Sequence, residues 1–138
     1  SLFKNMMPGT ACPLNKMPKC VVIDNASYEW NGDKPLNLPL NESIIYELHV
    51  KGFTASPSSG SKFSGTYRGL IEEIPYLKEL GITAVELLPV QEFDEFENTN
   101  VNPKTGKRMI NYWGYSTVAF FAPKCGYSSD KKPGACVN

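Results

Sequence analysis

Two apolar runs separated by a helical pattern constrain the fold of this chain more than any other feature. Residues 44–50 (IIYELHV) are rich in β-branched and aromatic residues, which is typical of a strand buried on both faces. Residues 66–80 carry apolar side chains on one helical stripe, and residues 82–90 (ITAVELLPV) form a second strand-like run. The order strand, helix, strand predicts a right-handed βαβ unit with parallel strands, and therefore an α/β fold.

Proline and glycine residues predict where the helix breaks and ends and where the irregular connector gives way to the folded region. Pro75 predicts that the helix kinks or restarts as a second short helix, and Gly81 predicts where it ends. Residues 1–42 hold seven prolines and glycines, so we expect an irregular connector there, followed by a folded region over residues 43–138. Within the connector, residues 20–23 suggest an edge strand or a packed arm, and residues 28–33 suggest a turn that carries aromatic anchors.

The region after the second strand is expected to be mostly irregular. Residues 91–109 read as one long loop, which is unusual in a compact domain unless the loop is functional. Residues 117–121 predict one short further strand. A single βαβ unit leaves its strand edges open and buries little apolar area. We therefore expect the chain to be the beginning of a larger fold.

Charge and hydropathy exclude two classes of partner. Lys plus Arg and Asp plus Glu each number 14, so the formal net charge is zero and no clustered positive excess exists for nucleic acid. No apolar run approaches the roughly 18 to 20 residues that span a bilayer, so no membrane partner is expected. The first residues do not resemble a secretory signal, and we expect a cytoplasmic protein.

The four cysteines are Cys12, Cys20, Cys125 and Cys136. Their spacing does not match paired zinc ligands, which lie two to four residues apart, so we expect neither a metal nor another cofactor. Free thiols in a reducing compartment are the favoured interpretation. A small disulfide-stabilised extracellular domain remains an alternative.

The aromatic run at residues 111–115 (NYWGY) is the densest chemical signal. Planar rings stack on the apolar faces of sugars, and neighbouring amides bind the hydroxyl groups. From residue types alone, however, packing of these rings in a core is the more common outcome.

The carboxylates at residues 92–97 and the side chain of His49 each allow a catalytic and a structural interpretation. The carboxylates at residues 92–97 could serve as acid and nucleophile, but a solvated loop is the favoured interpretation. His49 is the only histidine, and no nucleophile elbow accompanies it, so we expect a strand-end histidine satisfied by hydrogen bonds.

Several segments together resemble one family. Residues 44–54 resemble the first barrel strand of isoamylase-type debranching enzymes of the α-amylase superfamily, glycoside hydrolase family 13. Residues 65–83 resemble their first helix and second strand, and the resemblance continues through residues 86–93, 111–117 and 120–123. The segments at residues 17–19 and 28–33 resemble the approach to the barrel. The resemblance covers about residues 17–138.

The resemblance implies a fold, an activity and a site. It implies the N-terminal portion of a (β/α)8 TIM barrel, comprising the first βαβ unit and the long loop after strand two. It also implies hydrolysis of α-1,6 branch linkages in glycogen, starch or amylopectin with retention of configuration. The family's catalytic carboxylates lie on later strands, so no catalytic residue is expected here and the isolated chain is expected to be inactive. Tyr112 is placed against the sugar by this resemblance, supported by Trp113, with Tyr115 as a weaker candidate. The alternative is a non-catalytic α-glucan-binding protein.

Overall fold

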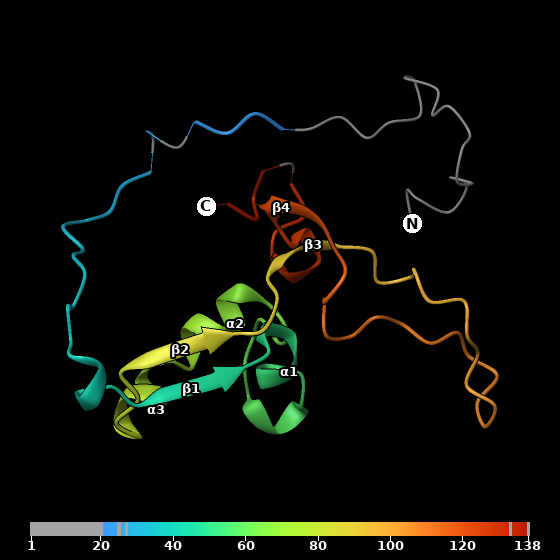
Figure 1. Cartoon of the computed structure of the whole chain (residues 1–138), viewed down its shortest axis with the longest axis horizontal. Coiled ribbons are helices and arrows are strands. Elements are labelled where there is room, and N and C mark those ends of the chain that lie inside the picture. Colours follow the sequence, from blue (N-terminus) through green and yellow to red (C-terminus); the bar gives the residue numbers. More distant parts are fainter. Residues whose placement is uncertain (1–20, 25, 27, 133, 138) are drawn as a thin grey trace.

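The computed structural model of the chain describes residues 21–24, 26, 28–132 and 134–137. Cys12 and Cys20 lie outside the described residues, as do residues 17–19. The described part comprises a parallel strand pair with helices, a smaller antiparallel strand pair and an extended N-terminal segment (Figure 1).

The predicted βαβ unit is confirmed. Strands β1 (Ile45–Leu48) and β2 (Ala84–Leu87) pair in parallel, with Ile45 opposite Ala84 and Leu48 opposite Leu87. Between them the chain forms the helices α1 (Val50–Thr54), η4 (Pro57–Ser59), α2 (Tyr67–Glu72) and α3 (Ile74–Glu79). The two parallel strands lie side by side, with α2 and α3 behind them and α1 beyond the tip of β1 (Figure 1).

The first strand is shorter than the sequence predicts. It ends at Leu48, and Val50 begins helix α1 instead of continuing the strand to residue 50. The cause is local, because the His49 side chain caps the helix by accepting a hydrogen bond from the Gly52 N–H at 2.9 Å. This turn places His49 directly at the carboxyl end of β1.

The helical pattern divides where Pro75 predicts. Helix α2 ends at Glu72, and α3 begins at Ile74 with Pro75 in its first turn, where the missing N–H of proline has no helical partner to lose. Gly81 follows α3 with a φ of 79°, a left-handed conformation that glycine adopts without strain. The expected restart and end of the helix are both confirmed.

The expected long loop begins with a strand. Strand β3 (Gln91–Phe93) pairs antiparallel with β4 (Thr117–Pro123), so the prediction of continuous loop over residues 91–109 is wrong at its start. A three-residue strand carries too little periodicity to be recognised in sequence. The short strand expected at residues 117–121 is confirmed and extends to Pro123. The 3-10 helix η5 (Cys125–Tyr127) follows β4.

Leu48 of β1 and Leu77 of α3 are buried, but the main apolar cluster lies beside the parallel strands. Its fully buried members are Val50, Phe93 and Tyr127, which bring together α1, β3 and η5. Most residues of β1 and all of β2 are at least partly exposed, so burial of these strands on both faces is wrong for the part of the chain that the structure describes. The physical reason is that a two-stranded pair leaves both of its edges open and buries few of its side chains.

The described part of the connector is mainly extended. Val21 and Ile23 lie close to Gly134 of the C-terminal turn, as the packed-arm alternative expects, and the rest runs outside the packed body, with the 3-10 helix η3 (Leu40–Glu42) near its end (Figure 1). The turn expected at residues 28–33 is confirmed, because Asp33 N–H donates to the Trp30 carbonyl at 2.9 Å and the Tyr28 and Trp30 rings meet at 5.0 Å. Residues 21–23 form no strand. None of the described helices is long and apolar enough to cross a membrane.

Candidate functional site

His49 organises a group of aromatic rings at the carboxyl end of β1. Its Nδ1 atom accepts the Gly52 N–H, so the neutral ring is assigned its proton on Nε2, which donates to the Tyr112 carbonyl at 2.9 Å. The Tyr127 hydroxyl lies 3.2 Å from the same Nε2 atom. Desolvation lowers the pKa of His49, which favours this neutral form. The expectation of a strand-end histidine satisfied by hydrogen bonds is confirmed.

Tyr112 and Trp113 pack around this histidine. The Tyr112 ring stacks on the His49 ring with centroids 4.6 Å apart and an angle of 14° between planes. Trp113 meets the Tyr112 ring edge-on at 5.6 Å and the His49 ring edge-on at 5.9 Å. A Cβ atom at Gly52 would lie 2.9 Å from the Tyr112 hydroxyl oxygen, so this glycine makes room for the stack. We call His49, Tyr112 and Trp113 the aromatic patch.

Two rings of the aromatic patch are exposed to solvent, and the third is buried. Tyr112 is 36% exposed and Trp113 56% exposed, whereas His49 is 7% exposed. Within the described residues these two rings therefore lie at the surface and not in the core. Tyr115 is 64% exposed, and no ring contact joins it to the patch in the described part of the chain. The structure thus brings Tyr112 and Trp113 together and leaves Tyr115 apart.

Tyr127 supports the aromatic patch from the core. Its ring meets the His49 ring at 5.7 Å and the Phe93 ring at 6.3 Å, and burial raises its pKa to about 12. The phenol therefore stays protonated at neutral pH. Sequence reasoning missed this residue, since nothing in the sequence links it to His49, 78 positions away.

A tight turn sets the orientation of Tyr112 and Trp113. The Asn111 side-chain carbonyl accepts the Gly114 N–H at 2.9 Å, and the Asn111 amide donates to Glu97 at 2.8 Å. Gly114 has a φ of 84°, and a Cβ atom there would lie 2.9 Å from the Phe93 ring. Only glycine satisfies both the backbone conformation and the close approach.

Replacing Gly114 with alanine is expected to lower the free energy of unfolding by about 2 kcal/mol, through left-handed backbone strain and overlap with Phe93. Gly106→Ala is the matched control, because Gly106 has a φ of 65° but no atom lies within 4 Å of the position that a new methyl group would take. Its expected cost is about 1 kcal/mol, from the backbone alone. Urea unfolding of both variants measures the difference, and equal costs would contradict the packing role of Gly114.

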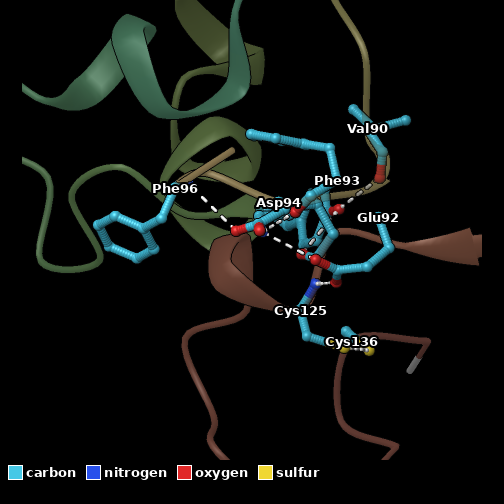
Figure 2. A network of polar contacts seen from close by, with 9 residues as sticks. Val90, Glu92, Phe93, Asp94, Phe96, Cys125 and Cys136 are labelled. Atoms are coloured by element: carbon cyan, nitrogen blue, oxygen red, sulfur yellow. Dashed lines mark hydrogen bonds and ion pairs between the residues drawn. The ribbon is translucent and has the colours of Figure 1, made fainter. Parts of the chain in front are cut away.

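The carboxylates of residues 92–97 are engaged in structural contacts. Glu92 forms a 2.8 Å ion pair with the buried Lys124 and also accepts the Cys125 N–H at 2.9 Å (Figure 2). Asp94 caps the following turn by accepting the Phe96 N–H at 2.9 Å. The favoured interpretation of a merely solvated loop is therefore wrong for Glu92, because the buried Lys124 needs this acceptor. The contact of Asp94 lies in an exposed turn, which agrees with that interpretation.

The described residues show no metal-binding cluster, and the hollow beside α2 lies away from the aromatic patch. No cluster of three or more histidine, cysteine or acidic side chains suited to a metal occurs among them. Cys125 and Cys136 are free thiols, as the favoured interpretation predicts. A hollow of about 520 Å³ lies between α2 and the C-terminal segment, lined by Arg68, Ile71 and Lys132 among others, and no patch residue lines it.

The chain has relatives of similar sequence among known proteins. No family model matches the chain. It is 47% identical over 137 residues to "Isoamylase 1, chloroplastic" of Arabidopsis thaliana. The alignment covers 97% of this chain and 17% of the relative. It is 44% identical over 117 residues to the "Glycogen debranching enzyme" of Serratia proteamaculans, covering 82% of this chain and 17% of that relative. The chain thus spans about a sixth of the length of these relatives.

Solved structures with a similar fold are pullulanases. The pullulanase of Paenibacillus barengoltzii in complex with maltohexaose and α-cyclodextrin aligns with a TM-score of 0.61 and 29% identity, covering 77% of this chain and 18% of that chain. The pullulanase of Anoxybacillus sp. LM18-11 in complex with maltotetraose aligns with a TM-score of 0.58 and 29% identity, covering 99% of this chain and 18% of that chain.

The parallel βαβ unit and these structural neighbours define an α/β protein. The resemblance seen in the sequence is also confirmed. The chain is a relative of the isoamylase-type debranching enzymes of the α-amylase superfamily, glycoside hydrolase family 13.

Proposed function

We propose that residues 43–138 form the start of a (β/α)8 catalytic barrel and that residues 1–42 are a connector leading into it. The whole protein would be a glycoside hydrolase that cleaves α-1,6-glucosidic branch linkages in glycogen or starch with retention of configuration. Similarity to isoamylases and to a glycogen debranching enzyme supports this activity. The exposed apolar side chains of the parallel pair, including Ile45, Val85 and Leu87, support a barrel in which further strands cover them. The proposed location is cytoplasmic.

The observation that carries the proposal is the position of the aromatic patch. In parallel α/β sheets and barrels, ligands bind at the carboxyl ends of the strands. His49 is the first residue after β1, and it holds the Tyr112 ring at that end of the strand. Tyr112 and Trp113 together offer two exposed rings at right angles, which suits the apolar face of a glucose unit and its edge. We therefore assign α-glucan binding to Tyr112 and Trp113, with Tyr115 as an outlying contact.

The hydrolytic step requires groups beyond these residues. Retaining glycosidases use a carboxylate nucleophile and a carboxylic acid about 5 Å apart. Glu92 is occupied by Lys124 and by the Cys125 N–H, which leaves it unsuited to either role. In the proposed barrel the aromatic patch orients the sugar, and carboxylates on later strands carry out the cleavage. The 138-residue chain alone is therefore proposed to be inactive.

Retardation of the chain in a native gel that contains amylopectin tests the proposed site. Tyr112→Ala is expected to weaken retardation about fivefold, since one ring contact to a sugar contributes about 1 kcal/mol. Tyr76→Ala is the matched control, because Tyr76 is an exposed tyrosine on α3, away from the patch. Unchanged retardation of Tyr112→Ala, or equal loss in Tyr76→Ala, would reject the site.

A second candidate is a non-catalytic α-glucan-binding protein. It is favoured by one observation: the three rings of the aromatic patch contact one another within the described residues. The size of the native polypeptide, detected in a source extract with an antibody against residues 90–110, separates the two. A band several-fold above 15.3 kDa supports the hydrolase, and a band at 15.3 kDa supports the binding protein.

A further inference from the structure

Two cysteines outside the aromatic patch lie with their sulfur atoms almost in bonding position. The Sγ atoms of Cys125 and Cys136 are 2.9 Å apart, and both residues are free thiols (Figure 2). A disulfide bond is about 2.04 Å long, so the two sulfurs need to approach by less than about 1 Å. We call Cys125 and Cys136 the thiol pair.

Different segments of the fold position the two members of the thiol pair. Cys125 begins η5, and its N–H donates to Glu92 Oε2 at 2.9 Å, while Glu92 is itself fixed by the ion pair with Lys124. Cys136 lies in a turn in which the Val137 N–H donates to the Gly134 carbonyl at 3.1 Å. The two sulfurs therefore meet because β3, β4 and the C-terminal turn are in place, not because the cysteines are close in sequence.

The thiol pair is accessible to a reagent in solution. Cys125 is exposed and Cys136 is partly exposed. We propose that the thiol pair is a reversible dithiol–disulfide site, which is oxidised by a small-molecule or protein disulfide and reduced again by a dithiol. The proposal concerns this chain's own thiols and does not depend on glucan binding.

The chemistry is a two-step thiol–disulfide exchange. The Glu92 carboxylate lies beside Cys125 and accepts its N–H, and desolvation raises the pKa of the Cys125 thiol, so we assign the first attack to Cys136. Its thiolate bonds to one sulfur of the external disulfide and releases the other as a thiolate. Cys125 then loses its proton and attacks Cys136 Sγ, which forms the internal bond and releases the second thiolate. Two cysteine thiols are oxidised, and one external disulfide is reduced to two thiols.

The test uses the full chain with Cys12→Ser and Cys20→Ser, which leaves the thiol pair as its only thiols. This variant is equilibrated in glutathione buffers of rising oxidised fraction and quenched with a maleimide, and its intact mass is measured in native buffer and in urea. We expect the monomer to lose both maleimide adducts together as the oxidised fraction rises. The unlabelled monomer should then be lighter than the reduced chain by two hydrogens, and dithiothreitol should restore the reduced mass. The native chain should reach this state at about tenfold less oxidised glutathione than the chain in urea, because the fold raises the effective concentration of one thiol near the other.

Two results would overturn the proposal. One is coincidence of the native and urea transitions, and the other is accumulation of glutathione on each cysteine without an internal bond.

Adding Cys125→Ser tests the order of the steps. This variant is expected to stop at a mixed disulfide between Cys136 and glutathione, and the absence of that adduct would contradict attack by Cys136.

Discussion

Tyr127→Ala is expected to lower the free energy of unfolding by about 4 kcal/mol, the usual cost of truncating a fully buried aromatic ring. Tyr127 is 1% exposed and shares the core with Val50 and Phe93. Its ring also meets the rings of His49 and Tyr67. The variant should therefore lose most of the stability of so small a core, because native domains are stable by only about 5–15 kcal/mol. Urea unfolding followed by circular dichroism measures the loss.

Tyr127→Phe is the matched control for this prediction. It keeps the ring and removes the hydroxyl that lies 3.2 Å from His49 Nε2, so the expected cost is about 1 kcal/mol. If Tyr127→Ala cost no more than Tyr127→Phe, the ring would not be a core element. The account of how the aromatic patch is supported would then be wrong.

Lys124→Ala carries the second largest expected effect, a loss of about 3 kcal/mol. The Lys124 ammonium is buried, lies 2.8 Å from both Glu92 Oε1 and the Phe93 carbonyl oxygen, and sits 4.3 Å from the Phe93 ring centroid. Removing it leaves the Glu92 carboxylate without its ion-pair partner and opens a gap beside β3, and breaking a pair of this kind costs about 3 kcal/mol or more. Thermal or urea unfolding of the variant measures the loss.

The chain contains a matched surface pair as the control. Lys132 and Asp130 lie 3.6 Å apart with both side chains exposed, so Lys132→Ala should cost about 0.5 kcal/mol or less. A similar small cost for Lys124→Ala would mean that the ion pair does not hold β3 against η5. The placement of Cys125 by Glu92 would then lose its structural basis.

The parts of the fold that were predictable are those with a local cause. Parallel pairing of residues 45–48 with residues 84–87 follows from the order of apolar runs, because a helical crossover leaves few other arrangements. The restart of the helix at Pro75 follows from the chemistry of proline alone. Residue types single out the aromatic run at residues 111–115 but favour its packing in a core, whereas Tyr112 and Trp113 contact each other and are exposed in the described part of the chain.

The parts that were missed depend on contacts between distant residues. The sequence predicts Val50 in a strand, but the helix cap provided by His49 starts a helix at this residue. Glu92 reads as a loop carboxylate, and its role as the partner of Lys124 follows only when β3 and β4 pair. Cys125 and Cys136 are separated by a spacing with no meaning for metal binding, and only the folded C-terminal turn brings their sulfurs together.

The central claim is that the aromatic patch binds an α-glucan, and the indole N–H signals of the two tryptophans test it most directly. The chain has only Trp30 and Trp113, and Trp30 lies in the connector turn, away from the patch. In a two-dimensional nuclear magnetic resonance titration with maltohexaose, we expect the Trp113 signal to shift in a saturable way while the Trp30 signal stays in place. A Trp113 signal that does not move at saturating sugar, or a shift at Trp30 in its place, would contradict the claim.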